Sequence, residues 1–451
     1  MSIDAALVTH PTYRLAYAAA VNQISRIFPV VAFTEMPAQP IAITPWDTNA
    51  PIRSVREPSL VVHFGMEQFG KPRLVSANAS DWHVYLDTPC DPPRDDFNPV
   101  LAILTAAYAC SRATKLLLND AVEGAKCWRP FSILDFDSGT VEFDWSAPIA
   151  IDRTTLAGVG AIGSAFLCTA LAHSQLVGEL VIVDEDVIDK TNLGRYVLFS
   201  AHDVGQKKVI AAERRLRSLK PGLTINPVDL RLQTYSKEQS AKDQHFKIQR
   251  LVSAPDRRDT RRSFQSELPR EIIDASTGPN QIVIHRNGYE REWACLECIY
   301  PRIEIEDAHY EHVAYKLGIP LQRVKSGELI DVSDAEAIHS IYPSLAVDDL
   351  LGRAFDSVFR ELCSAGELRV EDRVVLAPMP FVSAAAGAYL YLEMIKSIKH
   401  GIFASFRRYN YVQMNPFFPP NPSFAEMRPS REGCTCQSAV YRHAFERLWS
   451  E

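Results

Sequence analysis

Three glycines lie close together in the stretch LAGVGAIGSAFLCTALAH, at Gly158, Gly160 and Gly163. This G-x-G-x-x-G spacing lets a backbone turn sharply and approach a phosphate, while the helix that follows offers unpaired N–H groups to it. Asp184 ends the next predicted strand, near the distance at which an acid binds ribose hydroxyls. The pattern predicts a nucleotide site, for which NAD is the first interpretation. A tight turn without a ligand is the alternative.

Further charged and amide side chains follow the glycines within a short stretch. Asp186, Asn192 and Arg195 lie within twelve positions counted from Asp184, and Lys208 ends the segment VGQKK. A bound nicotinamide has no need of this set. Phosphoryl or adenylyl transfer needs cations to offset the charge that grows on a leaving pyrophosphate, and it needs an acid to hold magnesium. The set therefore favours a site that splits ATP over a site that keeps NAD.

Two cysteine pairs form the second group of candidate residues. They are Cys295-x-x-Cys298 and Cys434-x-Cys436. Each pair can bind one ion from two sides, and together they provide the four thiolates that a structural zinc prefers. All four positions would then be filled, so we expect no catalytic role for this metal. Free buried thiols are the alternative interpretation.

The order of these motifs, GVGAIG, then VDEDVIDKTNLGR, then VGQKK, resembles the adenylation domain of ubiquitin-activating enzymes. It is similar also to the bacterial relatives that adenylate sulfur-carrier proteins for molybdopterin and thiamine synthesis. The resemblance implies ATP and Mg²⁺ as cofactors, with Asp184 on the ribose and Asn192, Arg195 and Lys208 on the phosphates. It implies that Asp256 binds the magnesium, and it supports a structural zinc at the two cysteine pairs.

The sequence departs from the family pattern at several places. Tyr196 stands where a glutamine is usual, and Arg257 stands where an asparagine is common. The second cysteine pair is C-x-C rather than C-x-x-C. The family also brings an arginine to ATP from another domain or subunit, and the motifs do not identify its equivalent. Arg261 does follow Asp256 at the family's spacing.

Cys363 is the candidate nucleophile. It is the only cysteine between the two pairs, and it lies after the periodic segment DDLLGRAFDSVFREL and before a polar stretch. In the ubiquitin-activating branch that the chain resembles, the catalytic cysteine has this position. The end of a helix does not stabilise a thiolate, but an acyl-adenylate is reactive enough for a moderately activated thiol. A thiol without a role is the alternative, and Cys168 is expected in the core.

The elements that position these residues alternate between strand and helix. A strand at 155–157, the glycine turn, a helix to residue 173 and a strand at 179–186 form a β-α-β unit. Further strands and helices predict an α/β fold with a doubly wound, mostly parallel, Rossmann-like sheet. The expected units are an adenylation domain at 146–301 and 373–451, an inserted helical subdomain carrying Cys363 at 302–372, and an N-terminal α/β domain at 1–145.

The N-terminal domain shows no phosphate loop. Its apolar helix at 98–118 has the same pattern as the helix at 380–398, with a proline followed by small and apolar residues. We interpret the domain as an inactive, degenerate adenylation copy. A conjugating-enzyme domain with Cys90 or Cys110 as its thiol, and an unrelated dimerisation or docking domain, are the alternatives.

Composition excludes several classes of protein. The net charge is −7 and no block of like charges is present, which argues against a general nucleic-acid binder. The sequence shows neither an apolar run of the roughly 20 residues needed to cross a bilayer nor a secretory pattern at its start. We therefore expect no membrane partner, a cytoplasmic location and nine reduced cysteines.

Together these observations predict an ATP-dependent activating enzyme. The C-terminal carboxylate of a ubiquitin-like protein would be adenylated, transferred to Cys363 as a thioester and passed to a conjugating enzyme. A homodimer is compatible with this prediction. The alternatives are a sulfur-carrier adenylyltransferase without a thioester step, an NAD(P)-dependent oxidoreductase, and a scaffold that binds carriers without catalysis.

Overall fold

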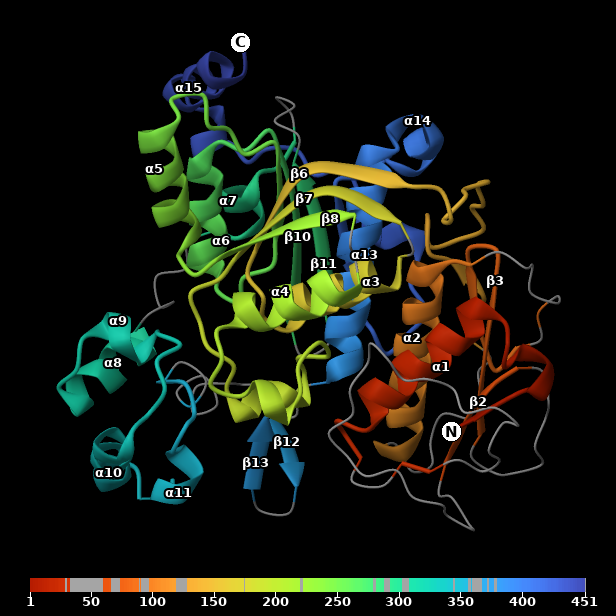
Figure 1. The fold of residues 1–451 in the computed structure, drawn as a ribbon, viewed down its shortest axis with the longest axis horizontal. Helices are drawn as coiled ribbons and strands as arrows, with labels where there is room; N and C mark the ends of the chain where they lie inside the picture. The colour runs from red at the N-terminus through yellow and green to blue at the C-terminus, as the bar shows by residue number, and fades with distance from the viewer. Residues whose placement is uncertain are drawn as a thin grey trace.

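The computed structural model describes most of the chain. The described residues are 1–28, 31–32, 60–65, 74–88, 90, 97–118, 128–173, 175–219, 222–278, 281–287, 293–301, 308–343, 345–355, 358, 367–370, 373–376 and 379–450. They form a large sheet, a small sheet and a separate hairpin, with helices packed on and between the two sheets (Figure 1).

The large sheet has eight strands in the order β15-β14-β11-β10-β9-β6-β7-β8. Their bounds are β6 Ile149–Ala157, β7 Leu176–Val183, β8 Leu223–Val228, β9 Arg250–Ser253, β10 Glu271–Gly278, β11 Gln281–Asn287, β14 Tyr411–Met414 and β15 Ala425–Glu426. The run from β10 to β8 is parallel throughout, and β11, β14 and β15 continue the sheet in antiparallel pairs. The predicted doubly wound, mostly parallel sheet is confirmed, but the antiparallel edge was not foreseen.

Alternating residues of the central strands face opposite layers of helices. Leu180 and Ile182 of β7 join one apolar cluster, whereas Val181 and Val183 join another. This follows from the two-residue period of a strand. One face carries α3 Ala161–Ala172, α4 Lys208–Leu219 and α13 Pro380–Ile398, and the other carries α5 Leu232–Lys242, α6 Arg258–Phe264 and α7 Leu296–Ile299.

The small sheet is built from the N-terminal residues in the order β1-β2-β3-β4-β5. Its strands are β1 Ser2–Ile3, β2 Val61–Phe64, β3 Leu74–Ser80, β4 His83–Leu86 and β5 Phe131–Ser132. Two parallel pairs are followed by two antiparallel pairs. The run β6-β9-β10-β11-β14 of the large sheet has the same sequence of two parallel and two antiparallel pairs.

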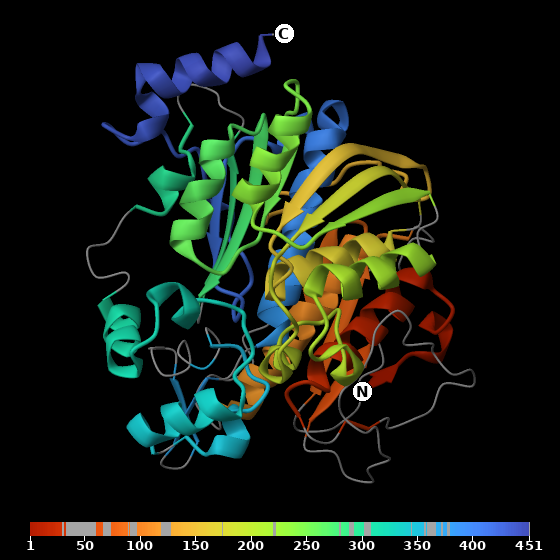
Figure 2. The same cartoon turned by 60° about the vertical axis from the view of Figure 1, so that its left-hand side comes forward.

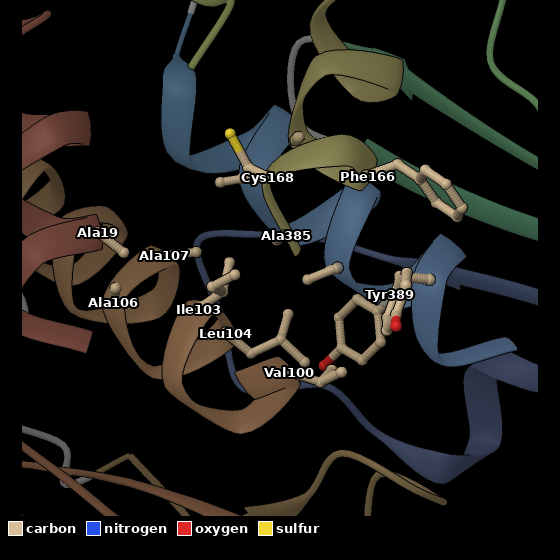
Figure 3. Packing of buried hydrophobic residues seen from close by; sticks show 14 of the residues in the cluster. Ala19, Val100, Ile103, Leu104, Ala106, Ala107, Phe166, Cys168, Ala385 and Tyr389 are labelled. Carbon is tan, nitrogen blue, oxygen red and sulfur yellow. The ribbon is translucent and has the colours of Figure 1, made fainter. Parts of the chain in front are cut away.

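Four helices fill the space between the two sheets. They are α1 Pro11–Ile24 and α2 Pro99–Leu118 from residues 1–145, here called the N-terminal half, and α3 and α13, which pack on the large sheet. One apolar cluster runs through all of them, so the two halves share a single core. Figure 3 shows that many contacts are made by small residues, such as Ala19, Ala107 and Ala385. A Cβ on Gly387 would lie 2.5 Å from the Cβ of Ala165, so α13 and α3 approach closely.

The helix α2 is long and apolar enough to span a membrane by length and composition alone. Of its most apolar window, 83% is buried inside the protein. It packs between α1 and α13, against the small sheet. Among the described residues it is the one helix that meets this test, and its burial identifies it as a core helix.

The stretch between the large sheet's β11 and α13 contains a group of short helices. They are α8 Ala308–Leu317, α9 Leu321–Val324, α10 Val332–Ile341 and α11 Val347–Leu350. These helices have an apolar core of their own and lie to one side of the large sheet, apart from the N-terminal half (Figure 2). A hairpin of β12 Glu367–Val370 and β13 Arg373–Leu376 follows, a feature that helical periodicity did not predict.

The last helix, α15 Ala439–Trp449, lies at one end of the molecule, next to the C-terminus and above α5 in the view of Figure 1. The Tyr441 hydroxyl donates to the carbonyl of Gln265 over 3.0 Å, and the Trp449 indole donates to the carbonyl of Leu268 over 2.9 Å. These two bonds fasten an otherwise exposed helix to the segment that follows α6, and the second cysteine pair lies just before this helix in the chain.

Candidate functional site

The glycine loop connects β6 to α3 at the carboxyl edge of the parallel strands. Gly158 has a φ of +96°, and a Cβ there would lie 2.7 Å from the backbone of Ala254. A Cβ on Gly163 would overlap the carbonyl oxygen of Gly158. These two glycines are therefore required by the fold of the loop itself. Gly160 differs, because its nearest neighbour would be the Tyr196 hydroxyl at 3.6 Å, so it leaves open space at the start of α3.

Asp184, at the end of β7, is buried beneath the loop. Its Oδ2 atom accepts the Val159 N–H over 2.6 Å, and its Oδ1 atom accepts the Asp186 N–H over 2.9 Å. Burial, partly opposed by the charge of Lys208, raises the pKa of this carboxyl to about 6. The acid thus shapes the loop in addition to any contact with a ribose, a role that its sequence position did not suggest.

Lys208 begins α4 and points at the same pair of acids. Its Nζ atom lies 2.7 Å from Oδ2 of Asp186 and 3.8 Å from Oδ1 of Asp184. Burial alone would lower the pKa of Lys208, but the two carboxylates outweigh it and hold that pKa well above the ordinary value. The lysine is therefore a fixed cation beside the glycine loop.

The N-L-x-R segment forms a short 3-10 helix, η2 Lys190–Gly194, whose first residues are capped by side chains. The Oδ1 atom of Asn192 accepts the N–H of Asp189 over 3.0 Å. The Arg195 guanidinium lies 5.5 Å from the centre of the Tyr196 ring, and the Lys208 ammonium lies at the same distance. Tyr196, the departure from the family pattern, thus gathers both cations against the glycine loop.

Asp256 follows β9 and is exposed at the rim of the site. The two residues before it pack against Gly158, so the acid lies at the same edge as the glycine loop. Arg261 is buried and donates to the carbonyl of Pro255 and to Asp274. Asp274 also accepts hydrogen bonds from Ser253 and Tyr300, both over 2.6 Å.

This buried network fixes the loop that carries Asp256. Arg261 could be identified from the sequence by its spacing from Asp256, whereas Asp274 was not predicted. An acid within the apolar strand EIIDAS was the available signal, because a buried charge requires partners.

The insertion touches the site as well. A Cβ on Gly327, in the loop between α9 and α10, would overlap the side chain of Asp186. The backbone N–H of Ala354 donates to Asp189, the residue that caps η2. The polarity of the insertion predicts a separate subdomain, but it carries no signal that the insertion packs on the D-x-D loop.

A family model, described as the ThiF family, matches residues 149–436, more than half of the chain. The chain belongs to the ThiF family. The predicted resemblance to adenylation domains is thereby confirmed, and the interpretation as an NAD(P)-dependent oxidoreductase loses its support.

Several curated proteins are similar to this ThiF-family chain. The uncharacterized protein y4jF of Sinorhizobium fredii is 30% identical over 263 residues, 55% of this chain and 49% of that protein. The SAMP-activating enzyme E1 of Haloferax volcanii is 36% identical over 80 residues, 18% of this chain and 29% of that enzyme. The molybdopterin-synthase adenylyltransferase of Salmonella typhimurium is 34% identical over 91 residues, 20% of this chain and 36% of that enzyme. The matches span less than half of each relative's length.

Solved structures of E. coli MccB also align with the chain. The structure with succinimide covers 76% of this chain and 74% of that chain at 15% identity and a TM-score of 0.39.

The four cysteines of the ThiF-family chain meet at one point. The sulfur atoms of Cys295, Cys298, Cys434 and Cys436 all lie within 4.8 Å of one another. Separations of 3.6 Å join Cys295 to Cys298 and to Cys434, and 3.8 Å joins Cys298 to Cys436. The Arg431 N–H donates to the sulfur of Cys298 over 3.1 Å. The cluster could hold a metal ion with four sulfur ligands.

The remaining cysteines divide into two groups. Cys168 and Cys110 are buried, and burial raises the pKa of both thiols, so neither is a reactive thiolate. Cys90 is half-buried. The candidate nucleophile Cys363, like Cys127, lies outside the described residues.

Proposed function

We propose that this protein uses ATP to adenylate the C-terminal carboxylate of a ubiquitin-like or sulfur-carrier protein. The observation that carries the proposal is the meeting of two cations, Arg195 and Lys208, around the ring of Tyr196 at the glycine loop. A pyrophosphate that leaves with its growing charge needs such cations, and a nicotinamide does not. The relatives named as a SAMP-activating enzyme and a molybdopterin-synthase adenylyltransferase support the same reaction.

The reaction forms one bond and breaks one bond. A carboxylate oxygen of the carrier attacks the α-phosphorus, and the bond from that phosphorus to the oxygen bridging to the β-phosphate breaks, which gives an acyl-adenylate and pyrophosphate. Gly160 leaves room for the phosphates above the N-terminus of α3, and Lys208 and Arg195 balance the charge of the leaving group. Asp256 would hold Mg²⁺, which when bound offsets phosphate charge. Its exposed carboxylate beside the glycine loop fits that role.

The test is to supply the purified protein with ATP, Mg²⁺ and candidate carriers, and to measure AMP and pyrophosphate. We expect both products in equal amounts when hydroxylamine is present to trap the adenylate. A matched carrier lacking its C-terminal residue should give neither. Absence of both products with every ubiquitin-like and sulfur-carrier protein tried would overturn the proposal.

The finer proposal is that the acyl group then moves to Cys363 as a thioester and on to a conjugating enzyme. The described part of the insertion packs on the D-x-D loop through Gly327 and on the η2 cap through Ala354, which supports a route from the adenylate into this subdomain. The second candidate is a sulfur-carrier adenylyltransferase that needs no thioester, and the relatives' names favour it equally.

The cysteine cluster is proposed to bind a structural zinc. Tetrahedral coordination at a Zn–S distance of 2.3 Å places two sulfurs about 3.8 Å apart. The observed separations of 3.6 to 3.8 Å fit that geometry. The ion would fasten the segment before α15 to α7 and its N-cap, two parts of the chain that lie far apart in the sequence.

The N-terminal half is proposed to be an adenylation-like copy that binds no nucleotide. Its strands β1 to β5 pair in the same order and sense as the run β6-β9-β10-β11-β14 of the large sheet. Helix α1 follows β1 as α3 follows β6, and α2 lies between β4 and β5 as α13 lies between β11 and β14. After β1 comes Asp4, whose carboxylate fills the space left by Gly65 and is bonded to His63 over 3.0 Å. A carboxylate at this point repels phosphate. Calorimetry should therefore find one ATP per chain, and two would contradict the proposal.

A further inference from the structure

We infer that Arg26, from the N-terminal half, is a positioning residue for the phosphate-contacting segment of the adenylation half. It follows α1 by two residues and reaches the backbone on both sides of Arg195 and Tyr196. The inference rests on the proposed function for its effect on catalysis, whereas the contact itself is a property of the fold.

One guanidinium is surrounded by the carbonyls of a single curled segment. Its Nη1 atom donates to the carbonyl of Leu193 over 2.5 Å, and its Nη2 atom donates to those of Val197 and Phe199 over 3.3 and 3.1 Å. Residues 193 to 199 thus wrap around the Arg26 side chain. Arg195 and Tyr196 lie at the turn of this wrap.

A second residue of α1 holds the guanidinium in place. The Oδ1 atom of Asn22 accepts the Nε–H of Arg26 over 3.1 Å, and its Nδ2 atom donates to the carbonyl of Val197 over 3.4 Å. Asn22 is fully buried, so its orientation is fixed by the shared core. Because α1 packs on α2 and α13, the position of the segment that bears Arg195 depends on how the N-terminal half is docked.

An arginine is needed here for a geometric reason. Its planar fork has donors pointing in several fixed directions, which match carbonyls on both sides of the side chain. A lysine has the same charge and three donors, but all three are on one nitrogen, so it cannot bond the Leu193 carbonyl and the carbonyls on the other side of the segment together with Asn22. Without the clamp, Arg195 would sample more positions, and a group that must contact a phosphate would be misplaced.

The test uses Arg26→Lys and Arg26→Gln, with Arg14→Ala as the matched control. Arg14 is an exposed arginine on the same helix. We expect hydrogen exchange of the backbone amides of residues 193 to 199 to rise at least tenfold in both Arg26 variants, while exchange in α2 and α13 stays unchanged. Arg14→Ala should leave both regions as in the wild type. Unchanged exchange at 193–199 in Arg26→Lys would overturn the inference even if the protein proved to have another activity.

The catalytic part is tested by a double-mutant cycle on carrier-dependent ATP–pyrophosphate exchange. We expect about a tenfold loss of kcat in Arg26→Lys and at most a twofold further loss when it is added to Arg195→Ala, because Arg26 acts through Arg195. If the losses of kcat in the two single variants multiplied in the double variant, the inference would be overturned. It would also be overturned if the loss of kcat in every variant were explained by a lower thermal midpoint. No exchange in the wild type would refute the proposed function instead, and the amide measurement would still decide on the clamp.

Discussion

The Nζ atom of the buried Lys208 lies 2.7 Å from Oδ2 of the half-buried Asp186, and this ion pair links α4 to the loop after β7. The same ammonium lies 3.8 Å from Oδ1 of Asp184, so one cation pairs with two carboxylates. Gly327 of the insertion packs directly on the Asp186 side chain. If ATP binds as proposed, its phosphates and the insertion would meet at the same pair of residues.

Replacing this lysine should affect both stability and chemistry. In Lys208→Ala two acids lose their shared partner, and breaking a buried pair costs about 3 kcal/mol or more. We expect a lower free energy of unfolding by that amount and loss of pyrophosphate formation by at least a hundredfold. Urea unfolding and the ATP–pyrophosphate exchange rate measure the two effects.

The neighbouring residue provides the control for that experiment. Lys207 pairs with Asp229 over 3.0 Å, but its side chain is 42% exposed. A surface pair contributes about 0 to 1 kcal/mol. Lys207→Ala should therefore remain active and nearly as stable as the wild type. Equal losses in both variants would mean that the burial of Lys208 has no special role.

The glycine loop gives a second prediction, in which two similar changes have different effects. In Gly163→Ala the new Cβ overlaps the carbonyl of Gly158, so the loop must shift, with an overpacking cost of about 1–3 kcal/mol or more. In Gly160→Ala the Cβ meets only ordinary contacts, since the Tyr196 hydroxyl is 3.6 Å away. Gly160→Ala should keep its thermal midpoint yet bind ATP at least tenfold more weakly. Calorimetry measures the ATP affinity and thermal unfolding measures the midpoint. An unchanged ATP affinity in Gly160→Ala would show that the phosphates bind elsewhere.

Asp184 gives a prediction about pH. Burial raises the pKa of its carboxyl to about 6, above the unfolded value of about 3.9. The native state therefore binds this proton more tightly, and the associated stabilisation is present below about pH 4 and is lost as pH rises through 6. Asp184→Asn has no such proton.

The difference in unfolding free energy between wild type and Asp184→Asn should consequently change by about 2 kcal/mol between pH 4 and pH 7, with the wild type relatively weaker at the higher pH. Denaturant unfolding at a series of pH values measures this difference, and groups common to both proteins cancel. A difference that is constant across this range would contradict the raised pKa.

The cysteine cluster gives a fourth prediction. We expect one zinc per chain by elemental analysis, and none in Cys298→Ser. That variant should also melt several degrees lower, because bound metal contributes to folding free energy. Cys90→Ser is the control, since Cys90 belongs to the N-terminal half and not to the cluster. A zinc-free wild-type protein whose thermal midpoint is the same in Cys298→Ser would show that the thiols are simply packed together.

Residue types and spacing were enough to predict the central sheet and the groups around its loop. Glycines, strand-ending acids and cysteine pairs carry local constraints, and therefore Gly158, Asp184 and the four sulfurs could be identified without coordinates. The sequence predicts the long apolar helices α2 and α13 equally well, since their apolar patterns extend over several turns.

Contacts between distant segments could not be predicted in this way. The clamp by Arg26 joins residues 167 or more positions apart, and a surface-like arginine after a helix carries no signal of it. The docking of Gly327 on Asp186 and the network around Asp274 depend on tertiary packing in the same way. Strand β3 was not predicted although Val75, Ala77 and Ala79 alternate with polar residues and lie in the shared core, because alanine is a weak signal for a strand.

The last prediction separates the two branches of the proposed function. With carrier and ATP, the wild type should form a covalent carrier adduct that survives a non-reducing gel and is lost on reduction. In that step the Cys363 thiolate attacks the acyl carbon and AMP leaves. Cys363→Ala should lose the adduct but still release pyrophosphate in a first turnover, because the adenylation residues are intact. Cys90→Ala, which also removes a thiol, should keep the adduct.

Two results would count against the thioester step. A reducible adduct in Cys363→Ala would assign the acyl group to another thiol. AMP formation without any adduct in the wild type would favour the sulfur-carrier branch, in which the adenylate itself is the product. The docking of the insertion on Asp186 and Asp189 would then serve to cover the adenylate from water, since an acyl-adenylate that is not transferred to a thiol must be protected until its acceptor arrives.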